Sequence, residues 1–153
     1  MSFAPAAWNP VPPFVSRIDS VRSVLDQPKA LAAAEAILER DKSREDVMFY
    51  VAQHYFVSKR EPGKVLDYST ALLSLSGTKT RPEEISEEVW KKQWATVTQQ
   101  AHWMIGSIRS QQENWSEADK ALRAALGTSV PGTDLSVMLL NSLGWANYKM
   151  RNI

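Results

Sequence analysis

The stretch that decides the fold is MIGSIRSQQENWSEADKALRAAL, residues 104–126, which contains two helical patterns separated by a polar turn. Gly106 lies twelve residues before Ala118, and Ala118 is followed by Leu122 after four residues and by Ala125 after seven. Residues three or four apart lie on the same side of an α-helix. Small residues on that side let two helices approach closely, and the large one fills the space beside them. The stretch therefore predicts a tightly packed pair of helices.

The rest of the chain shows the same helical spacing between prolines, glycines and polar turns. Ser43, Ser86 and Ser116 are expected N-caps, and residues 61–63, Glu-Pro-Gly, are expected to form a turn. No alternating pattern is long enough for a strand, so the sequence predicts an all-α fold. The expected helices cover residues 14–25, 28–40, 43–59, 65–76, 86–112, 116–127 and 133–153.

Length and composition restrict the class of protein. The chain has 153 residues, about one domain. Its 18 Lys and Arg against 17 Asp and Glu leave a net charge of +1, which argues against a nucleic-acid partner. The absence of cysteine excludes disulfides, zinc ribbons and thiol catalysis. No apolar run reaches the roughly 18 residues of a membrane span. We therefore expect a soluble protein with no membrane partner, and its compartment stays open.

The N-terminal residues differ from the rest. Residues 1–13 hold four prolines, which predict an extended Pro-rich arm in front of a helical domain over residues 14–153. The arm lacks the basic and apolar regions of a signal peptide.

Residues 104–126 resemble the tetratricopeptide repeat (TPR) family. That family has a Leu-Gly pair in its first helix, an aromatic residue in the turn, an Ala early in its second helix, a large apolar residue one turn later and then an Ala-Leu pair. The corresponding residues here are Ile105-Gly106, Trp115, Ala118, Leu122 and Ala125-Leu126.

Two other units resemble the repeat less closely. One has Ala52 as its small residue, Lys64 where the family has Ala, and then Tyr68. The other is half a unit that begins with Leu143-Gly144. Together the resemblance covers about residues 14–153. It implies antiparallel helix pairs stacked as a TPR-like right-handed solenoid of about seven helices, three repeats plus a half, so that the domain ends partway through a repeat.

The resemblance also implies where a partner binds. In TPR proteins the first helix of each pair lines a concave groove, at positions three before, one after and four after the small residue. The positions are aromatic or polar and uncharged, unlike the basic ones of the family members that clamp a carboxylate. Carried over to this chain, they are Phe49, Gln53, Phe56, Trp103, Ser107, Ser110, Asn141, Trp145 and Tyr148.

The last expected helix is apolar almost all round, and such a helix is normally buried on more than one side. Leu135, Leu139 and Trp145 are therefore candidates for self-association. Two elements could cover the apolar surface of this helix: the missing second helix of the half repeat, or another subunit.

The sequence contains no catalytic, cofactor-binding or metal-binding pattern. The only histidines, His54 and His102, lie in expected helices without ligands at metal spacing. The leading hypothesis is a non-catalytic protein-interaction scaffold that binds a peptide or a partner helix in an aromatic groove. The alternatives are a homo-oligomerisation module and a helical enzyme or small-molecule binder with a pocket around Trp103 and His102.

Overall fold

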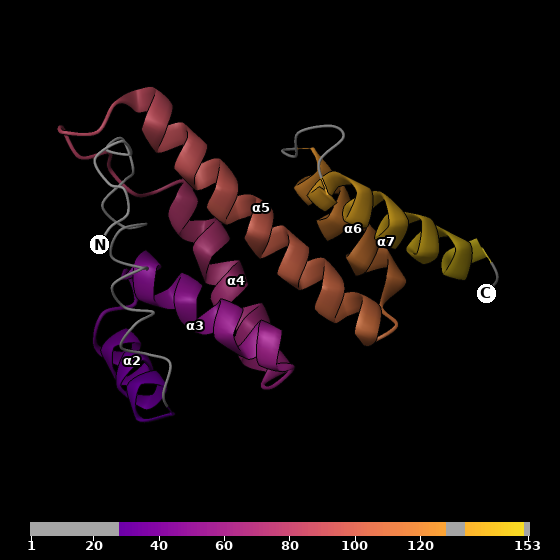
Figure 1. Cartoon of the computed structure of the whole chain (residues 1–153), viewed down its shortest axis with the longest axis horizontal. Coiled ribbons are helices and arrows are strands. Elements are labelled where there is room, and N and C mark those ends of the chain that lie inside the picture. Colours follow the sequence, from indigo (N-terminus) through magenta and orange to yellow (C-terminus); the bar gives the residue numbers. More distant parts are fainter. Residues whose placement is uncertain (1–27, 128–133, 152–153) are drawn as a thin grey trace.

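The computed structural model describes residues 28–127 and 134–151, and these residues form helices joined by turns (Figure 1). No strand occurs among them, so the predicted all-α fold is confirmed. The arm expected at 1–13 and the helix expected at 14–25 lie outside the described residues. The helices are α2 (Pro28–Arg40), α3 (Glu45–Ser58), α4 (Pro62–Ser76), α5 (Glu87–Gln111), α6 (Trp115–Leu126) and α7 (Asp134–Arg151).

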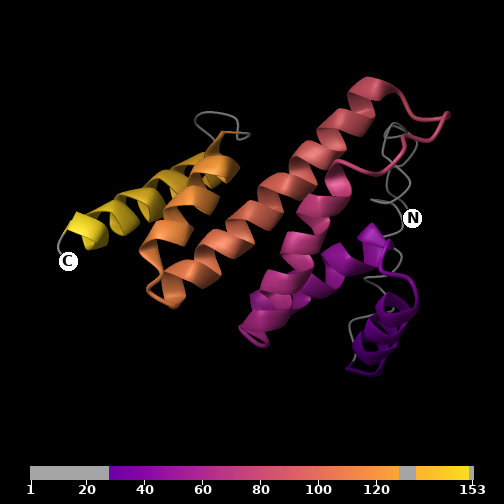
Figure 2. The same ribbon diagram turned by 180° about the vertical axis from the view of Figure 1, so that it is seen from behind.

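The long helix α5 runs through the middle of the described structure. Helices α2, α3 and α4 lie on one side of it, and α6 and α7 lie on the other (Figures 1 and 2). Each helix packs mainly against the next one along the chain, and α5 also touches α7. This order follows from the short turns, which leave consecutive helices beside one another. No helix in the described ranges is both long and apolar enough to cross a membrane.

The ends of α5 follow the sequence closely. The Ser86 side chain caps the helix, with its hydroxyl oxygen accepting a hydrogen bond from the Val89 amide at 3.2 Å. Lys91 forms an ion pair with Glu87 one turn earlier, at 3.0 Å. The carboxylate lies at the positive end of the helix dipole, so the first turn is stabilised twice.

Two other expected caps are wrong. Ser43 does not cap α3, because its amide and its hydroxyl both donate to the carboxylate of Asp41, and Arg44 is the last residue before the helix. Ser116 does not cap α6, which begins one residue earlier than expected. There the side-chain oxygen of Asn114 accepts from the Glu117 amide at 3.4 Å. In the first case the Asp41 carboxylate engages the serine's own donors, and in the second Asn114 caps the helix in place of the serine.

The expected turn at residues 61–63 is also wrong in detail. Pro62 is the first residue of α4, where its fixed φ and missing amide hydrogen suit the helix start. The chain reverses just before it, through Lys59 and Glu61, whose φ values are 57° and 47°. These left-handed residues turn α4 back against α3.

The buried apolar residues form two clusters. The larger one joins α2, α3, α4 and α5 and includes Val51 and Leu72, both fully buried. The smaller one joins α6 and α7 and includes Leu122 and Leu139, also fully buried. Among the described residues, Trp103 of α5 is the one side chain that packs against both clusters. It therefore connects the two halves of the described structure.

Helices α5 and α6 approach each other closely at Gly106. An ideal Cβ built there would lie 2.7 Å from Cγ and Cδ2 of Leu122, too close for any real side chain. We expected Ala118 to pack against this turn of α5, and Ala118 is indeed fully buried. The side chain that fills the space over Gly106, however, is Leu122. A glycine at this position lets α6 lie closely on α5.

Candidate partner-binding surface

The expected groove positions differ in exposure from one helix to the next. Those on α3 and α5 are buried or partly buried, whereas those on α7 are exposed. The buried one is Phe49, the partly buried ones are Gln53, Phe56, Trp103, Ser107 and Ser110, and the exposed ones are Asn141, Trp145 and Tyr148. The α7 positions therefore offer the largest accessible surface of the set.

Two of the expected groove residues meet between α3 and α5. The rings of Phe56 and Trp103 pack edge to face, with centroids 6.5 Å apart and an interplanar angle of 72°. This geometry suits the charge distribution of aromatic rings. Phe49 does not join them at the surface, because it lies in the larger core cluster.

The expected α7 residues form an aromatic pair on the surface. Trp145 and Tyr148 stack with ring centroids 5.6 Å apart and an interplanar angle of 27°. Their exposed fractions are 54% and 57%. The Lys149 ammonium lies 4.9 Å from the centre of the Trp145 ring, within the range of a cation–π interaction. The pair is thus held in place and remains open to a partner.

Further apolar side chains continue this surface toward the start of the helix. Val137, Met138 and Leu140 are each about half exposed. Gly144 lies on the same side, and no described atom lies within 4 Å of an ideal Cβ built on it. We call this surface the α7 face and define it as Val137, Met138, Leu140, Asn141, Gly144, Trp145 and Tyr148, all of which are exposed.

The three self-association candidates fall in different places. Trp145 belongs to the α7 face. Leu139 does not, because it is fully buried in the cluster between α6 and α7. Leu135 lies in the first turn of α7, and its side chain is outside the described residues. Any self-association surface on α7 is therefore formed by the exposed residues and not by Leu139.

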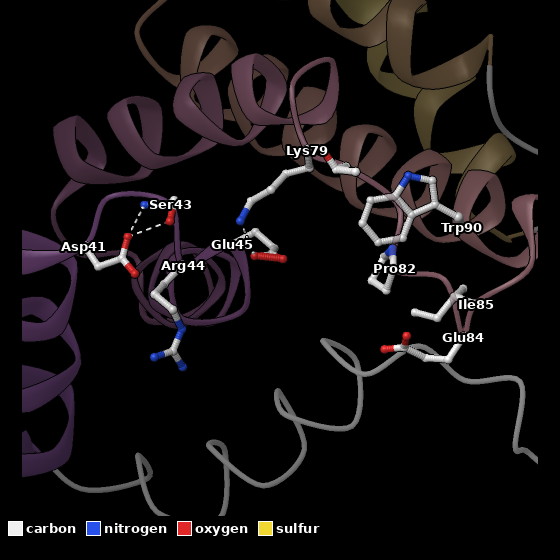
Figure 3. A pocket seen from close by; sticks show the side chains of 10 residues that line it. Asp41, Ser43, Arg44, Glu45, Lys79, Pro82, Glu84, Ile85 and Trp90 are labelled. Atoms are coloured by element: carbon white, nitrogen blue, oxygen red, sulfur yellow. Dashed lines mark hydrogen bonds and ion pairs between the residues drawn. The ribbon is translucent and has the colours of Figure 1, made fainter.

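A cavity with a volume of about 400 Å³ lies at the N-terminal end of α3. It opens between the turn before α3 and the connection from α4 to α5, and its lining includes Pro82 of that connection and Trp90 of α5 (Figure 3). Its two basic side chains are paired with carboxylates. Lys79 lies 3.2 Å from Glu45, and Arg44 binds both carboxylate oxygens of Asp46, at 2.9 and 3.0 Å. Such pairing offsets both positive charges and weakens their attraction for an anionic ligand.

The histidines do not line this cavity or a second, smaller one beside Tyr55 and Ile108. Neither Trp103 nor His102 lines them, so neither cavity is the pocket that a small-molecule binder around these two residues requires. Partial burial lowers the pKa of His102, which keeps its ring neutral at pH 7. In the described part of the chain, no group of three or more metal-ligating side chains is close enough to hold an ion.

A polar cluster that the sequence did not reveal joins α2 to α3 and α4. The carboxylate of Glu35 accepts hydrogen bonds from the Tyr55 hydroxyl at 2.8 Å, the Lys64 ammonium at 2.8 Å and the Tyr68 hydroxyl at 3.4 Å. Its partners are 20 to 33 residues further along the chain, and only helix packing brings them together. No local pattern around Glu35 signals such a cluster.

The cluster shifts the pKa of Glu35. Partial burial alone would raise this pKa, but the hydrogen bonds from Lys64 and Tyr55, the Lys64 charge and the bond from Tyr68 together lower it below its usual value of 4.5. Burial and the neighbouring carboxylate raise the pKa of Tyr55, which keeps its hydroxyl protonated as a donor. Glu35 therefore remains ionised and holds the three helices together.

This shift predicts a loss of stability in acid. A carboxylate whose pKa is lowered on folding contributes stability above its unfolded pKa, and that contribution disappears as pH falls through the folded value. We expect the unfolding free energy of the wild type to fall below about pH 4.5 more steeply than that of Glu35→Gln, in urea titrations at several pH values. Tyr55→Phe removes one hydrogen-bond donor to Glu35, so the loss of unfolding free energy in this variant should occur at higher pH than in the wild type. Parallel curves for wild type and Glu35→Gln would contradict this role.

No family model, curated protein or solved structure matches this chain.

Proposed function

We propose that this chain is a non-catalytic protein-interaction scaffold whose helix pairs stack as a TPR-like solenoid of three repeats and a half. The observation that carries the proposal is the α7 face. Monomeric proteins rarely expose an apolar patch much larger than a few hundred Å², and patches of that size are often functional. This one includes a stacked Trp and Tyr, two of the residue types most enriched at binding hot spots and interfaces.

The packing of α5 and α6 supports the repeat architecture. Leu122 covers Gly106, and Ala118 and Ala125 are fully buried, as the spacing of the repeat requires. The rings of Phe56 and Trp103 join α3 to α5 at one point, and α5 also touches α7. In a stacked array these alternate helices would line one side, which is where the resemblance puts the groove.

The test uses the full chain as bait in extracts of the cells that produce it. The Trp145→Ala/Tyr148→Ala variant removes the aromatic pair, and Val57→Ala removes a 78% exposed side chain of α3 as the matched control. Loss of one hot-spot pair costs about 2 kcal/mol or more, a drop of about 30-fold in affinity. We expect proteins retained by the wild type and by the control to be lost from the double variant, while its melting temperature stays the same. Equal retention by all three proteins would contradict the proposal.

A further inference from the structure

The α7 face is built like a surface that already holds a helix elsewhere in the chain. On α5, Gly106 is covered by Leu122, and the side-chain amide of Gln99 donates to the Ala125 carbonyl at 3.4 Å. Thirty-eight residues later, Val137 and Gly144 of α7 take the positions of Gln99 and Gly106. The burial pattern agrees with this offset, since residue 101 in α5 and residue 139 in α7 are both fully buried. A helix therefore fits against the α7 face.

Six of the seven residues of the α7 face form pairs that are symmetric about one point of the helix, and Met138 is the exception. Val137 and Tyr148 are equally distant from the midpoint between residues 142 and 143, and so are Leu140 and Trp145. If two copies of α7 pack in antiparallel orientation about that midpoint, Val137 lies level with Tyr148 of the second copy and Leu140 lies level with Trp145 of the second copy. The face is thus complementary to itself, which is what a two-fold interface requires.

At the centre of this antiparallel pair, the facing side chains are small. Asn141 lies opposite Gly144 of the second copy, because these two residues are also equally distant from the midpoint. No described atom occupies the space over Gly144. A glycine at the crossing point lets two helices approach closely, and Asn141 can keep its amide hydrated at the edge of the contact.

Charge favours the antiparallel orientation over the parallel one. The basic residues Lys149 and Arg151 lie in the last turn of α7. Side by side in a parallel pair they would repel each other, and the two helix dipoles would be aligned. In the antiparallel register the two Lys149 residues are about 20 Å apart along the axis at 1.5 Å per residue.

The available area reaches the lower limit for a specific dimer. The two aromatic side chains can each bury about 150–250 Å² when fully covered, and the five large side chains of the face, each about half exposed, together offer on the order of 500 Å². Two copies would bury about 1,000 Å², near the lower limit for a specific interface. We propose that the α7 face binds α7 of a second copy of this chain in antiparallel orientation. The inference rests on the proposed function and names the partner.

The first test is the mass in solution. By light scattering between about 1 and about 100 μM, a range that brackets a micromolar Kd, the wild type should approach twice its monomer mass of 17.2 kDa. Leu140→Lys puts a charge into the contact and should remain at the monomer mass, with its far-UV spectrum unchanged because Leu140 is 55% exposed. Val57→Lys is the control and should dimerise like the wild type. A wild type that stays monomeric throughout would overturn the proposal.

The second test fixes the register. The chain has no cysteine, so single-cysteine variants report on one position each. A disulfide needs Cα atoms within about 7 Å. Val137→Cys mixed with Tyr148→Cys should cross-link on mild oxidation, whereas Val137→Cys alone should not, because its two copies are about 16 Å apart along the axis. Cross-linking of Val137→Cys with itself would overturn the antiparallel register.

The two proposals fail in different ways. A monomeric wild type that captures another protein through Trp145 and Tyr148 would reject the second copy as the occupant and leave the scaffold function in place. A wild type that neither dimerises nor loses a captured protein in the Trp145→Ala/Tyr148→Ala variant would reject both.

Discussion

Trp103→Ala is expected to lower the free energy of unfolding by about 3 kcal/mol and to separate the unfolding of the two core clusters. Truncating a well-packed tryptophan typically costs about 3–5 kcal/mol, and the partial exposure of Trp103 places it at the lower end. Because this side chain packs against both clusters, its loss weakens the packing that couples their unfolding. The α6–α7 end should then open at a lower temperature than the rest.

Calorimetry and amide hydrogen exchange measure this effect. The wild type should give one transition, and Trp103→Ala should give two, with faster exchange in α6 and α7 than in α3 and α4. Trp145→Ala makes the same chemical change at a 54% exposed position and should cost less than about 1 kcal/mol in dilute protein. Equal losses in the two variants would mean that Trp103 is not a structural link and acts only at the surface.

The second large effect is expected at the contact between Gly106 and Leu122. Leu122→Ala should cost about 2–5 kcal/mol, because Leu122 is fully buried and the cavity closes only in part. Gly106→Ala should cost about 1–2 kcal/mol in the wild type. The added methyl would overlap Leu122, and the free-energy cost of that overlap exceeds the gain in helix propensity. In the Leu122→Ala background the space is free, and the same substitution should stabilise by about 0.5–1 kcal/mol.

This change of sign is measured by a double-mutant cycle with urea denaturation. Gly144→Ala in dilute protein is the control, because no described atom lies near its Cβ position, and it should stabilise in either background. If Gly106→Ala has the same effect with and without Leu122, the two side chains do not share the space between α5 and α6.

Local sequence signals were enough to locate the described helices. The limits of α2 were expected correctly, and Ser86 caps α5 as expected. The close approach at Gly106 was also expected, because close packing is one of the few physical reasons for a glycine within an apolar helical stripe. A turn before α4 was expected at residues 61–63, but its conformation was not, since Lys59 and Glu61 adopt the left-handed conformation although neither is glycine. Tertiary packing imposes that conformation, and a single sequence does not show it.

The candidate surface was predicted only in part. The sequence pointed to Trp145 and Tyr148, which are exposed, and to Phe49, which is buried. It also pointed to Leu139 as a self-association residue. Because α7 is apolar almost all round, periodicity could not indicate which side α6 covers, and the structure shows that this side includes Leu139. The Glu35 cluster was missed for a related reason, since its members share no local motif.

Each helix packs mainly against its neighbours in sequence, and this has a consequence for folding during synthesis on the ribosome. Contacts between segments that are close in sequence require little loop closure, so such a topology folds quickly. Ribosomes add about 5–20 residues per second, so a helix of this chain emerges in a few seconds or less. From α3 onward, each helix finds a docking surface already present on the helix before it. The described part of the protein can therefore assemble in the order of its synthesis, without waiting for distant segments to arrive.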